Sequence, residues 1–374
     1  MNEVRYRDTW HPYADGGGSS LELRDSRADN TAAGAWAASD EGAKAQWETY
    51  SYRAVAAADR GPTQWNEFVF GLLDEGALLI DDIHVYEAPS GARIELIQNP
   101  AFETGAAKWR CLGTHRHAQV VVDPDNPANH ALALVASGPT GHMHNHVETT
   151  LANGRTVVNG REYEISFRAK WLGGCNLLHT RLYFNRAART TALALPARRG
   201  TPGARNSVAE DNIGPTWGLV RHAPAVPQPA EPVIVTAEAS DPDGVGQCVL
   251  WWSVNGGQWQ HATMTEREGV FRGTIPGEAA GATIQFYLEG LDMRGAFSLF
   301  PPAGPDSRAL IRVDDGQARL EKLHNLRIIM TKADADFLHL ATNVMSNDRL
   351  GATVLYDERD IVYDAGVRLK SSQR

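Results

Sequence analysis

Cysteine is the first residue type that this sequence nearly lacks. Three cysteines, Cys111, Cys175 and Cys248, occur among 374 residues, and an odd number cannot pair completely within one chain. A disulfide scaffold is therefore excluded. We predict buried free thiols, which behave as small apolar side chains, with a bridge between Cys111 and Cys175 as the alternative.

Long apolar runs and an excess of positive charge are also missing. Runs such as "ALLI" at 77–80 are much shorter than the about 18 residues that span a bilayer. The net charge is −9, from 36 basic and 45 acidic residues, so the surface should repel nucleic acids and anionic lipids. We therefore expect no membrane span and no nucleic-acid partner.

The sequence also lacks catalytic motifs and a signal-peptide pattern. The sequence contains no Gly-rich phosphate loop, no nucleophile elbow, no paired-Cys metal motif and no marked acid/base pair of carboxylates. We expect no catalytic residues and no catalytic cofactor in this region. Its first residues lack the apolar core of a signal peptide, so the protein is cytosolic or its signal peptide lies outside this sequence.

Turn residues and alternating patterns are abundant. The sequence has 35 Gly and 19 Pro, and "EYEISFRAKW" (162–171) alternates apolar and polar side chains as a half-buried strand does. At this length several domains are expected. We predict a mainly β protein of tandem β-sandwiches: a jelly roll inserted in a lamin-tail-like sandwich, an Ig-like sandwich, and a small truncated α+β segment at the C-terminal end.

The Ig-like sandwich is predicted for residues 232–315, after a Pro-rich linker at 221–231. "DPDG" at 241–244 and "NGG" at 255–257 separate alternating strands, and Asn255-Gly256 suits a tight hairpin. The segment resembles immunoglobulin and fibronectin type III modules. That resemblance implies a spacer, because many functions share the fold.

The last segment, 316–374, combines strands with one helix. "LHNLRIIM", "ATVLYD" and "IVYDAGVRLK" have strand patterns, and "KADADFLHLATNVM" has helical periodicity with Thr331 as its cap and Asp334 three residues on. The segment resembles the beginning of a CotH-type kinase domain. Ser371 replaces a glycine of that pattern, and the resemblance implies that the catalytic residues follow Arg374. A downstream kinase-like domain is thus an expected partner in the full-length chain.

Two further resemblances concern the N-terminal half. "GGGSSLELRDSRADNTAAGAWAASD" and "GTPGARN" (200–206) resemble the final strands of a lamin-tail domain, which implies that 1–39 and 200–220 pack together around an insert at 40–199. The insert resembles a jelly-roll carbohydrate-binding module in "ELIQNPAFETGAAKW" and "NGREYEISFRAKW". The family's closing pattern, "ALLIDDIHVYE", here precedes its opening one. We infer a circular permutation through the "APSG" turn, with two incomplete tandem modules as the alternative.

The stretch "GHMHNHVET" (141–149) is the most distinctive candidate site. On a regular strand its three histidines and Glu148 would share one face, about 6.6 Å between alternate residues. Zinc needs three or four ligands at about 2.0–2.1 Å, which are hard to bring to one ion from a single strand; His115 or His117 is the candidate to complete the set, but Arg116 adds positive charge nearby. A metal-dependent hydrolase, a solvated face and a ligand-binding face all remain open, and we favour the last.

The predicted ligand-binding face joins this strand to two others. We expect one sheet to carry polar and aromatic groups suited to a sugar. The predicted residues are His142, His144, His146, Glu164, Arg168, His179, Arg181, Tyr183 and Asn185. The carbohydrate-module resemblance also implies a structural calcium ion held by Asp81 and Glu103, whose carboxylates suit a hard cation.

The predicted function follows from these patterns. We expect a noncatalytic region that binds a glycan or cell-surface polymer and mediates adhesion within a larger extracytoplasmic bacterial protein. A structural spacer that presents the kinase-like domain, and the metal-dependent hydrolase, are the alternatives.

Overall fold

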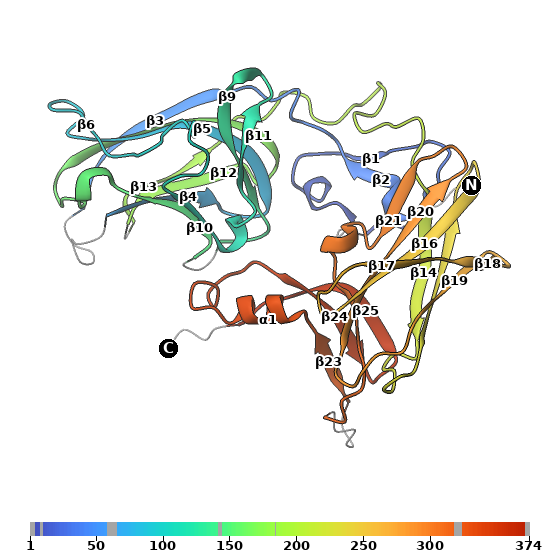
Figure 1. Cartoon of the computed structure of the whole chain (residues 1–374). Helices are drawn as coiled ribbons and strands as arrows, with labels where there is room; N and C mark the ends of the chain where they lie inside the picture. Colours follow the sequence, from blue (N-terminus) through green and yellow to red (C-terminus); the bar gives the residue numbers. More distant parts are fainter. Residues whose placement is uncertain are drawn as a thin grey trace.

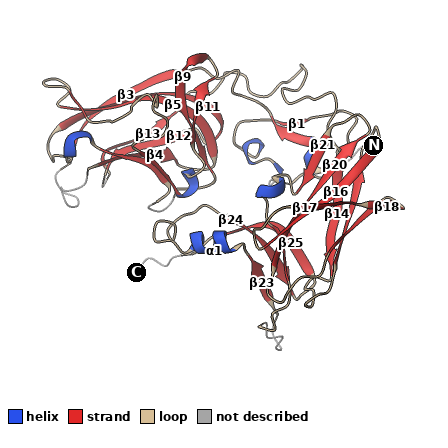
Figure 2. Ribbon diagram, viewed as in Figure 1, coloured by secondary structure: helices blue, strands red, loops and turns tan. Residues whose placement is uncertain are grey.

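The described part of the chain consists almost entirely of strands and loops. The computed structural model describes residues 4–7, 10–57, 66–140, 144–183, 185–317 and 324–370. Its strands form several separate sheets, and α1 (Lys332–Leu338) is the one α-helix among the described residues (Figures 1 and 2). The predicted mainly β fold class is confirmed. No helix in these ranges is long and apolar enough to cross a membrane.

The first sandwich pairs a five-stranded sheet with a six-stranded sheet. The five-stranded sheet has the order β13-β12-β4-β10-β7; the other has the order β3-β11-β5-β9-β8, with β6 paired to β5. The strands are β3 Glu48–Val55, β4 Glu67–Leu72, β5 Gly76–Glu87, β6 Ile94–Glu95, β7 Trp109–Leu112, β8 Gln119–Asp123, β9 Asn126–Ala136, β10 His146–Thr150, β11 Glu162–Gly174, β12 Leu177–Leu182 and β13 Arg186–Ala192.

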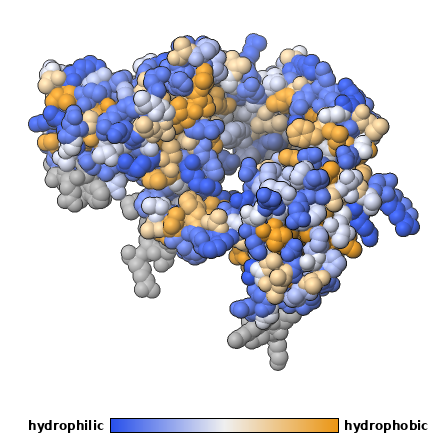
Figure 3. Space-filling model, viewed as in Figure 1, coloured by the Kyte–Doolittle hydropathy of each residue, from blue (hydrophilic) through white to orange (hydrophobic). Residues whose placement is uncertain are grey.

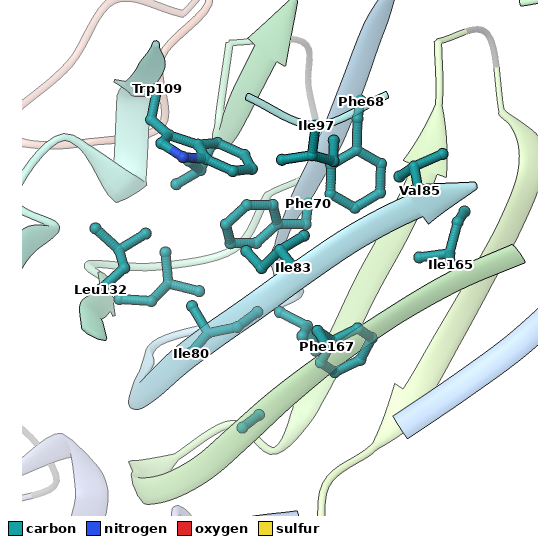
Figure 4. Packing of buried hydrophobic residues seen from close by; sticks show 14 of the residues in the cluster. Phe68, Phe70, Ile80, Ile83, Val85, Ile97, Trp109, Leu132, Ile165 and Phe167 are labelled. Atoms are coloured by element: carbon teal, nitrogen blue, oxygen red, sulfur yellow. The ribbon is translucent and has the colours of Figure 1, made fainter. Parts of the chain in front are cut away.

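The core of this sandwich follows from strand alternation. In β11, Ile165, Phe167 and Trp171 are at most 1% exposed, as the period-two pattern predicts. They belong to the same core cluster as Phe68 and Phe70 of β4, and Figure 4 shows Ile165 and Phe167 on the side of the core opposite these rings. One continuous cluster of buried side chains extends from β4 to beyond β13. Strands β5 and β6, on either side of the "APSG" turn, therefore share one core, and they pair with each other.

Residues of the N-terminal segment lie beside the loop at 200–212. The strands β1 (Leu21–Leu23) and β2 (Trp36–Ala38) form a small hairpin sheet. Glu22 is 4% exposed, and its carboxylate accepts hydrogen bonds from the Thr201 hydroxyl and from the backbone N and Oγ of Ser207. These bonds lower the pKa of Glu22, although burial alone would raise it. The lamin-tail resemblance stays a prediction.

The second sandwich starts earlier than the sequence predicts. Its strands are β14 Thr216–Ala223, β15 Val233–Ser240, β16 Val245–Val254, β17 Gln260–Thr263, β18 Thr265–Arg267, β19 Val270–Ile275, β20 Thr283–Asp292, β21 Phe297–Phe300 and β22 Ala309–Arg312. Strand β14 falls in the predicted remnant and linker, but it pairs with β15. The predicted boundary is wrong there because a strand's partner is not visible in its own sequence. Asn255 and Gly256 have φ angles of 51° and 73°, as the predicted hairpin requires.

The C-terminal segment forms a three-stranded sheet with one helix. Its strands are β23 Leu326–Ile329, β24 Leu350–Tyr356 and β25 Asp360–Val367. Thr331 caps α1 as predicted, because its Oγ1 accepts from the backbone N of Asp334 at 3.1 Å. The helix is shorter than the periodic pattern, which continued to Met345. Tyr363 of β25 packs edge-on against Phe286 of the second sandwich, with ring centroids 5.4 Å apart.

Polar side chains cover most of the visible surface. Figure 3 shows hydrophilic residues over both sandwiches, interrupted by smaller apolar patches. All three cysteines are free, as predicted, and the alternative bridge between Cys111 and Cys175 is not formed; Cys248 is buried, whereas Cys111 and Cys175 are partly exposed. Burial raises the pKa of the Cys111 thiol to about 11, which keeps it protonated.

A candidate ligand-binding face on the five-stranded sheet

Strand β4 places β10 and β12 on its two sides. Glu148 of β10 pairs with Val69 of β4, and Val69 pairs with Arg181 of β12. On the other side, Glu148 pairs with Arg110 of β7. Directly opposed residues of antiparallel strands point to the same face. The sheet thus carries a row of four side chains, Arg110, Glu148, Val69 and Arg181, on the face opposite the core.

A second row next to it contains His179. His179 pairs with Gly71 of β4 and with Thr190 of β13. Its Nδ1 lies 3.0 Å from Thr190 Oγ1. Burial and the nearby Arg181 lower the pKa of His179, so the ring is neutral at pH 7. A neutral imidazole both donates and accepts hydrogen bonds, as a sugar hydroxyl does.

Gly71 allows a buried histidine to cover this part of the sheet. A Cβ at Gly71 would lie 3.0 Å from His115 Nε2, so a larger residue would displace the ring. His115 is fully buried, and its Nε2 accepts from the backbone N of Leu72 at 3.0 Å. Burial, and then the neighbouring His146, lower its pKa to about 3. His115 is therefore a neutral structural group.

Glu148 is the carboxylate of the first row, and it accepts hydrogen bonds from two basic side chains. Its Oε1 accepts from Arg110 Nε at 2.8 Å, and its Oε2 accepts from His146 Nε2 at 3.0 Å. Burial alone would raise the pKa of Glu148, but the hydrogen bonds from His146 and Arg110 outweigh it and lower the pKa to about 2. The carboxylate is ionised at physiological pH, and both of its oxygens are engaged.

Tyr183 continues the face beyond the end of β12. Burial raises the pKa of its hydroxyl, and the carboxylates of Glu148 and Glu67 raise it further. The hydroxyl therefore stays protonated and can donate a hydrogen bond. Burial lowers the pKa of Arg181, but an arginine remains charged at any physiological pH. The face thus presents a cation, a neutral imidazole and a phenol along β12 and the residue that follows it.

The predicted histidine strand is only partly correct. Strand β10 begins at His146, which shares a face with Glu148. His144 has a φ of 68°, a left-handed conformation that ends the alternation before the strand starts. His142 lies outside the described residues. The prediction that these three histidines share one strand face therefore fails at His144.

Glu164 and Arg168 do not belong to this face. Strand β11 pairs with β3 and β5 in the six-stranded sheet, so the prediction that these residues share a sheet with β10 is wrong. Glu164 forms ion pairs with Arg53 and Arg93 at 2.7 and 3.3 Å. Asn185 lies in the turn after β12 with a φ of 55°, so it does not continue the strand face. Alternation predicts the face of a strand but not the sheet that it joins.

Asp81 and Glu103 have different partners. Glu103 is half exposed, and its carboxylate accepts from the backbone N and Nδ1 of His130 at 3.2 and 3.0 Å. Asp81 is fully buried, and its Oδ2 accepts from Asn129 at 3.0 Å, while its Oδ1 has no hydrogen-bond partner among the described residues. Burial raises the pKa of Asp81. Asp81 has one carboxylate oxygen left for a cation, with Arg168 3.8 Å from the other, whereas the Glu103 carboxylate is already hydrogen-bonded to His130.

A different acidic group lies at the edge of the second sandwich. Within the described ranges, Asp241, Asp243 and Asp292 are the only three His, Cys, Asp or Glu side chains whose ligand atoms lie within 4.8 Å of one another. Asp243 accepts hydrogen bonds from Arg27 and Arg294 at 3.0 and 3.2 Å. The two arginines balance the acidic charge, and "DPDG" forms the predicted turn. No described histidine joins a group of this kind.

Arg110 is the member of the face that the predicted set omits. The alternation in "WRCL" could have found it, since Trp109 is in the core and Arg110 must then point outward. What the sequence does not contain is the pairing of β7 with β10, which brings Arg110 to Glu148.

The described residues thus form a multi-sheet β-sandwich protein in which β7, β10, β4 and β12 build a polar sheet face. No protein-family model matches the sequence, and no curated protein matches it. Among solved structures, the chain is similar to a Br derivative of the carbohydrate-binding module BhCBM56, with 17% identity and a TM-score of 0.18 over 24% of this chain and 88% of that one. It is also similar to pullulanase from Bacillus acidopullulyticus, with 10% identity and a TM-score of 0.15 over 66% of this chain and 34% of that one. These TM-scores are too low to assign either fold to this chain.

Proposed function

We propose that the first sandwich binds a glycan on the outer face of its five-stranded sheet. The observation that carries the proposal is the row Arg110, Glu148, Val69 and Arg181, with His179 beside it. Sugars offer hydroxyls that both donate and accept hydrogen bonds. A neutral imidazole, a protonated phenol and fixed charges are matching partners for such groups.

Tyr183 adds apolar area to these polar groups. Its side chain is partly exposed, so one part of the ring is accessible. Aromatic rings contribute large contact area at low conformational cost, and the hydroxyl supplies a polar end. We therefore place the sugar against the outward side chains of β12 and β10, which flank the buried Val69 of β4.

Alanine variants of the face test the proposal. Glycan-array screening of the intact chain identifies a ligand, and calorimetry then measures its affinity. His179→Ala and Tyr183→Ala should each weaken binding about 5-fold to 150-fold, which corresponds to roughly 1–3 kcal/mol for a lost buried hydrogen bond. Arg53→Ala, on the six-stranded sheet, is the matched control and should leave affinity unchanged. Equal losses in all three variants, or no glycan bound at all, would contradict the proposal.

The wider role is an adhesion or ligand-binding region of a larger extracytoplasmic protein. The resemblance of the C-terminal segment to CotH-type kinases motivates this context.

A second candidate role is a spacer that holds a downstream domain, and one observation favours it. The C-terminal segment contacts both sandwiches, through Asp348 to the first and Tyr363 to the second. Small-angle scattering on the chain separates the two roles, because a spacer requires one fixed shape whether or not a glycan is bound.

We also propose that Asp81 holds a structural calcium ion. The support is its buried Oδ1 without a described partner, together with the buried Asp123 on the other side of Asn129. Asn129 donates to both carboxylates, at 3.0 and 3.2 Å, so these oxygens lie close together. Carboxylate oxygens are the ligands that calcium prefers. Glu103 takes no part in this proposal.

A further inference from the structure

Arg181 occupies an unusual place in the first row. On one side it faces Val69, and on the other the pairing of β12 with β13 is interrupted between Thr180 and Leu182. Ala187 and Ala188 lie opposite Arg181 at this bulge, and Ala187 has a φ of 47°. Bulges of this kind redirect a side chain and are frequent at functional sites. Neither alanine nor valine offers a side-chain acceptor to the guanidinium.

The two arginines of the row differ in their partners. Arg110 donates to Glu148 at 2.8 Å and to Thr150 at 3.1 Å. Arg181, by contrast, makes no hydrogen bond and no ion pair with any residue that the structure describes, although it lies in the same row. Glu148 interacts electrostatically with Arg181 but forms no hydrogen bond with it. Both oxygens of the Glu148 carboxylate instead accept hydrogen bonds from His146 and Arg110. The donors of Arg181 are therefore available.

We propose that the ligand of this face is an acidic glycan, and that Arg181 binds the carboxylate of a uronic acid residue. The inference rests on the glycan-binding function proposed above and names its substrate class. A guanidinium presents its donors in a planar fork that matches a carboxylate with two parallel hydrogen bonds. His179, in the adjacent row, then meets a neighbouring hydroxyl of the same sugar.

The charges around Arg181 agree with an anionic ligand. Glu148 is the carboxylate that interacts electrostatically with Arg181, and its charge is offset by Arg110. Glu67 lies one row further, beside Tyr183 rather than Arg181. A carboxylate that approaches Arg181 from solvent thus meets one available cation and one neutralised anion.

Matched acidic and neutral sugars test the inference. The probes are oligosaccharides of galacturonate, of mannuronate and of hyaluronan, each beside its carboxyl-reduced neutral form, titrated into the intact chain at pH 7 and low salt. At least one acidic probe should bind 10-fold or more tightly than its reduced form, and 0.5 M salt should weaken it. Arg181→Gln should remove this preference, and Arg181→Lys, which keeps the charge but not the fork, should retain only part of it.

Thermal stability separates binding from a structural role. Because Arg181 has no partner in the described fold and burial disfavours its charge, Arg181→Gln should melt at the same temperature as the wild type or above it. Arg53→Gln is the control and should keep the acidic preference. Equal binding of acidic and neutral forms, unchanged in Arg181→Gln, overturns the inference and leaves the glycan-binding function intact.

Two other outcomes would also overturn the acidic-glycan inference. Binding of no glycan by the wild type removes the proposed function and this inference together. Arg181-dependent binding of a sulfated oligosaccharide that has been carboxyl-reduced overturns the assignment of a carboxylate, because a sulfate ester then supplies the anion.

Discussion

The side-chain Oδ1 of Asn145 accepts a hydrogen bond from the backbone N of Asn347, 2.8 Å away. Asn145 immediately precedes β10, and the same oxygen accepts from the backbone N of Thr114. The loop after α1 thus continues the hydrogen bonding at the start of the histidine strand. Figure 1 shows α1 and this loop next to the first sandwich, although the rest of the segment lies against the second. The residue before His146 is thus hydrogen-bonded to a residue 202 positions further along the chain.

The first prediction concerns Asp348, the charged residue of this contact. It is 4% exposed, and its carboxylate accepts from Arg116 Nε and from Ser137 Oγ. Asp348→Ala leaves both donors without their acceptor, so we expect a loss of about 1–3 kcal/mol in the free energy of unfolding. Urea denaturation measures it. Asp336→Ala, which breaks an exposed pair with Lys332, should cost less than about 0.5 kcal/mol. Equal effects of the two variants would show that the contact does not stabilise the chain.

The second prediction is a pH dependence from Glu148. Its pKa in the folded state is about 2, below the ordinary value of 4.5. A lowered folded-state pKa stabilises the protein above the unfolded-state value, and this stabilisation is lost as the pH falls from about 4.5 through 2. The stability of Glu148→Gln should therefore change less between pH 6 and pH 3 than that of the wild type.

Denaturant unfolding at several pH values between 6 and 3 checks this expectation. The exposed Glu48, changed to Gln, is the control and should follow the wild type across the range. The same pH profile in Glu148→Gln and the wild type would mean that His146 and Arg110 do not stabilise the carboxylate.

Strand patterns in the sequence predict the fold better than the site, for a physical reason. Burial of Ile165, Phe167 and Trp171 depends on alternation, which is a local property of one strand. Membership of a sheet depends on partners far along the chain. The same alternation placed Arg168 and Arg181 outward, correctly in both cases, yet they lie on opposite sheets because β11 and β12 have different neighbours.

Backbone conformation limits prediction of the histidine strand in another way. Nothing in "HNH" requires a left-handed residue at His144, since histidine adopts that conformation infrequently. The turn at His144 packs closely on Gly113, where a Cβ would lie 1.9 Å from the carbonyl oxygen of His144. Glycine at position 113 leaves room for the turn at His144, which lies directly before β10. This contact is between segments about 30 residues apart, so the sequence of the strand alone does not reveal it.

The third prediction tests calcium at Asp81. Because an ion that binds the folded state alone stabilises it by mass action, 1 mM calcium chloride should raise the Tm of chelator-treated protein. Asp81→Asn should abolish that rise. Glu103→Gln should leave it intact, since Glu103 forms a separate pair with His130. Differential scanning calorimetry gives both values, and a calcium response that depends on Glu103 instead would restore the ligand set expected from the sequence.

The fourth prediction concerns Glu22, which holds the loop at 200–207 against the N-terminal segment. Its two carboxylate oxygens accept from Ser20, Thr201 and Ser207, and the carboxylate is nearly inaccessible to solvent. Glu22→Ala removes the buried acceptor that these more exposed donors share, at a cost of about 1 kcal/mol. We expect faster amide hydrogen exchange at residues 200–207. The matched control is Glu210→Ala, which removes a half-exposed partner of Arg24 from the same loop and should change exchange little. Since Ser207 donates to Glu22 through both its backbone N and its hydroxyl, protection of its amide is the most direct readout, and unaltered protection there in Glu22→Ala would refute the role given to this carboxylate.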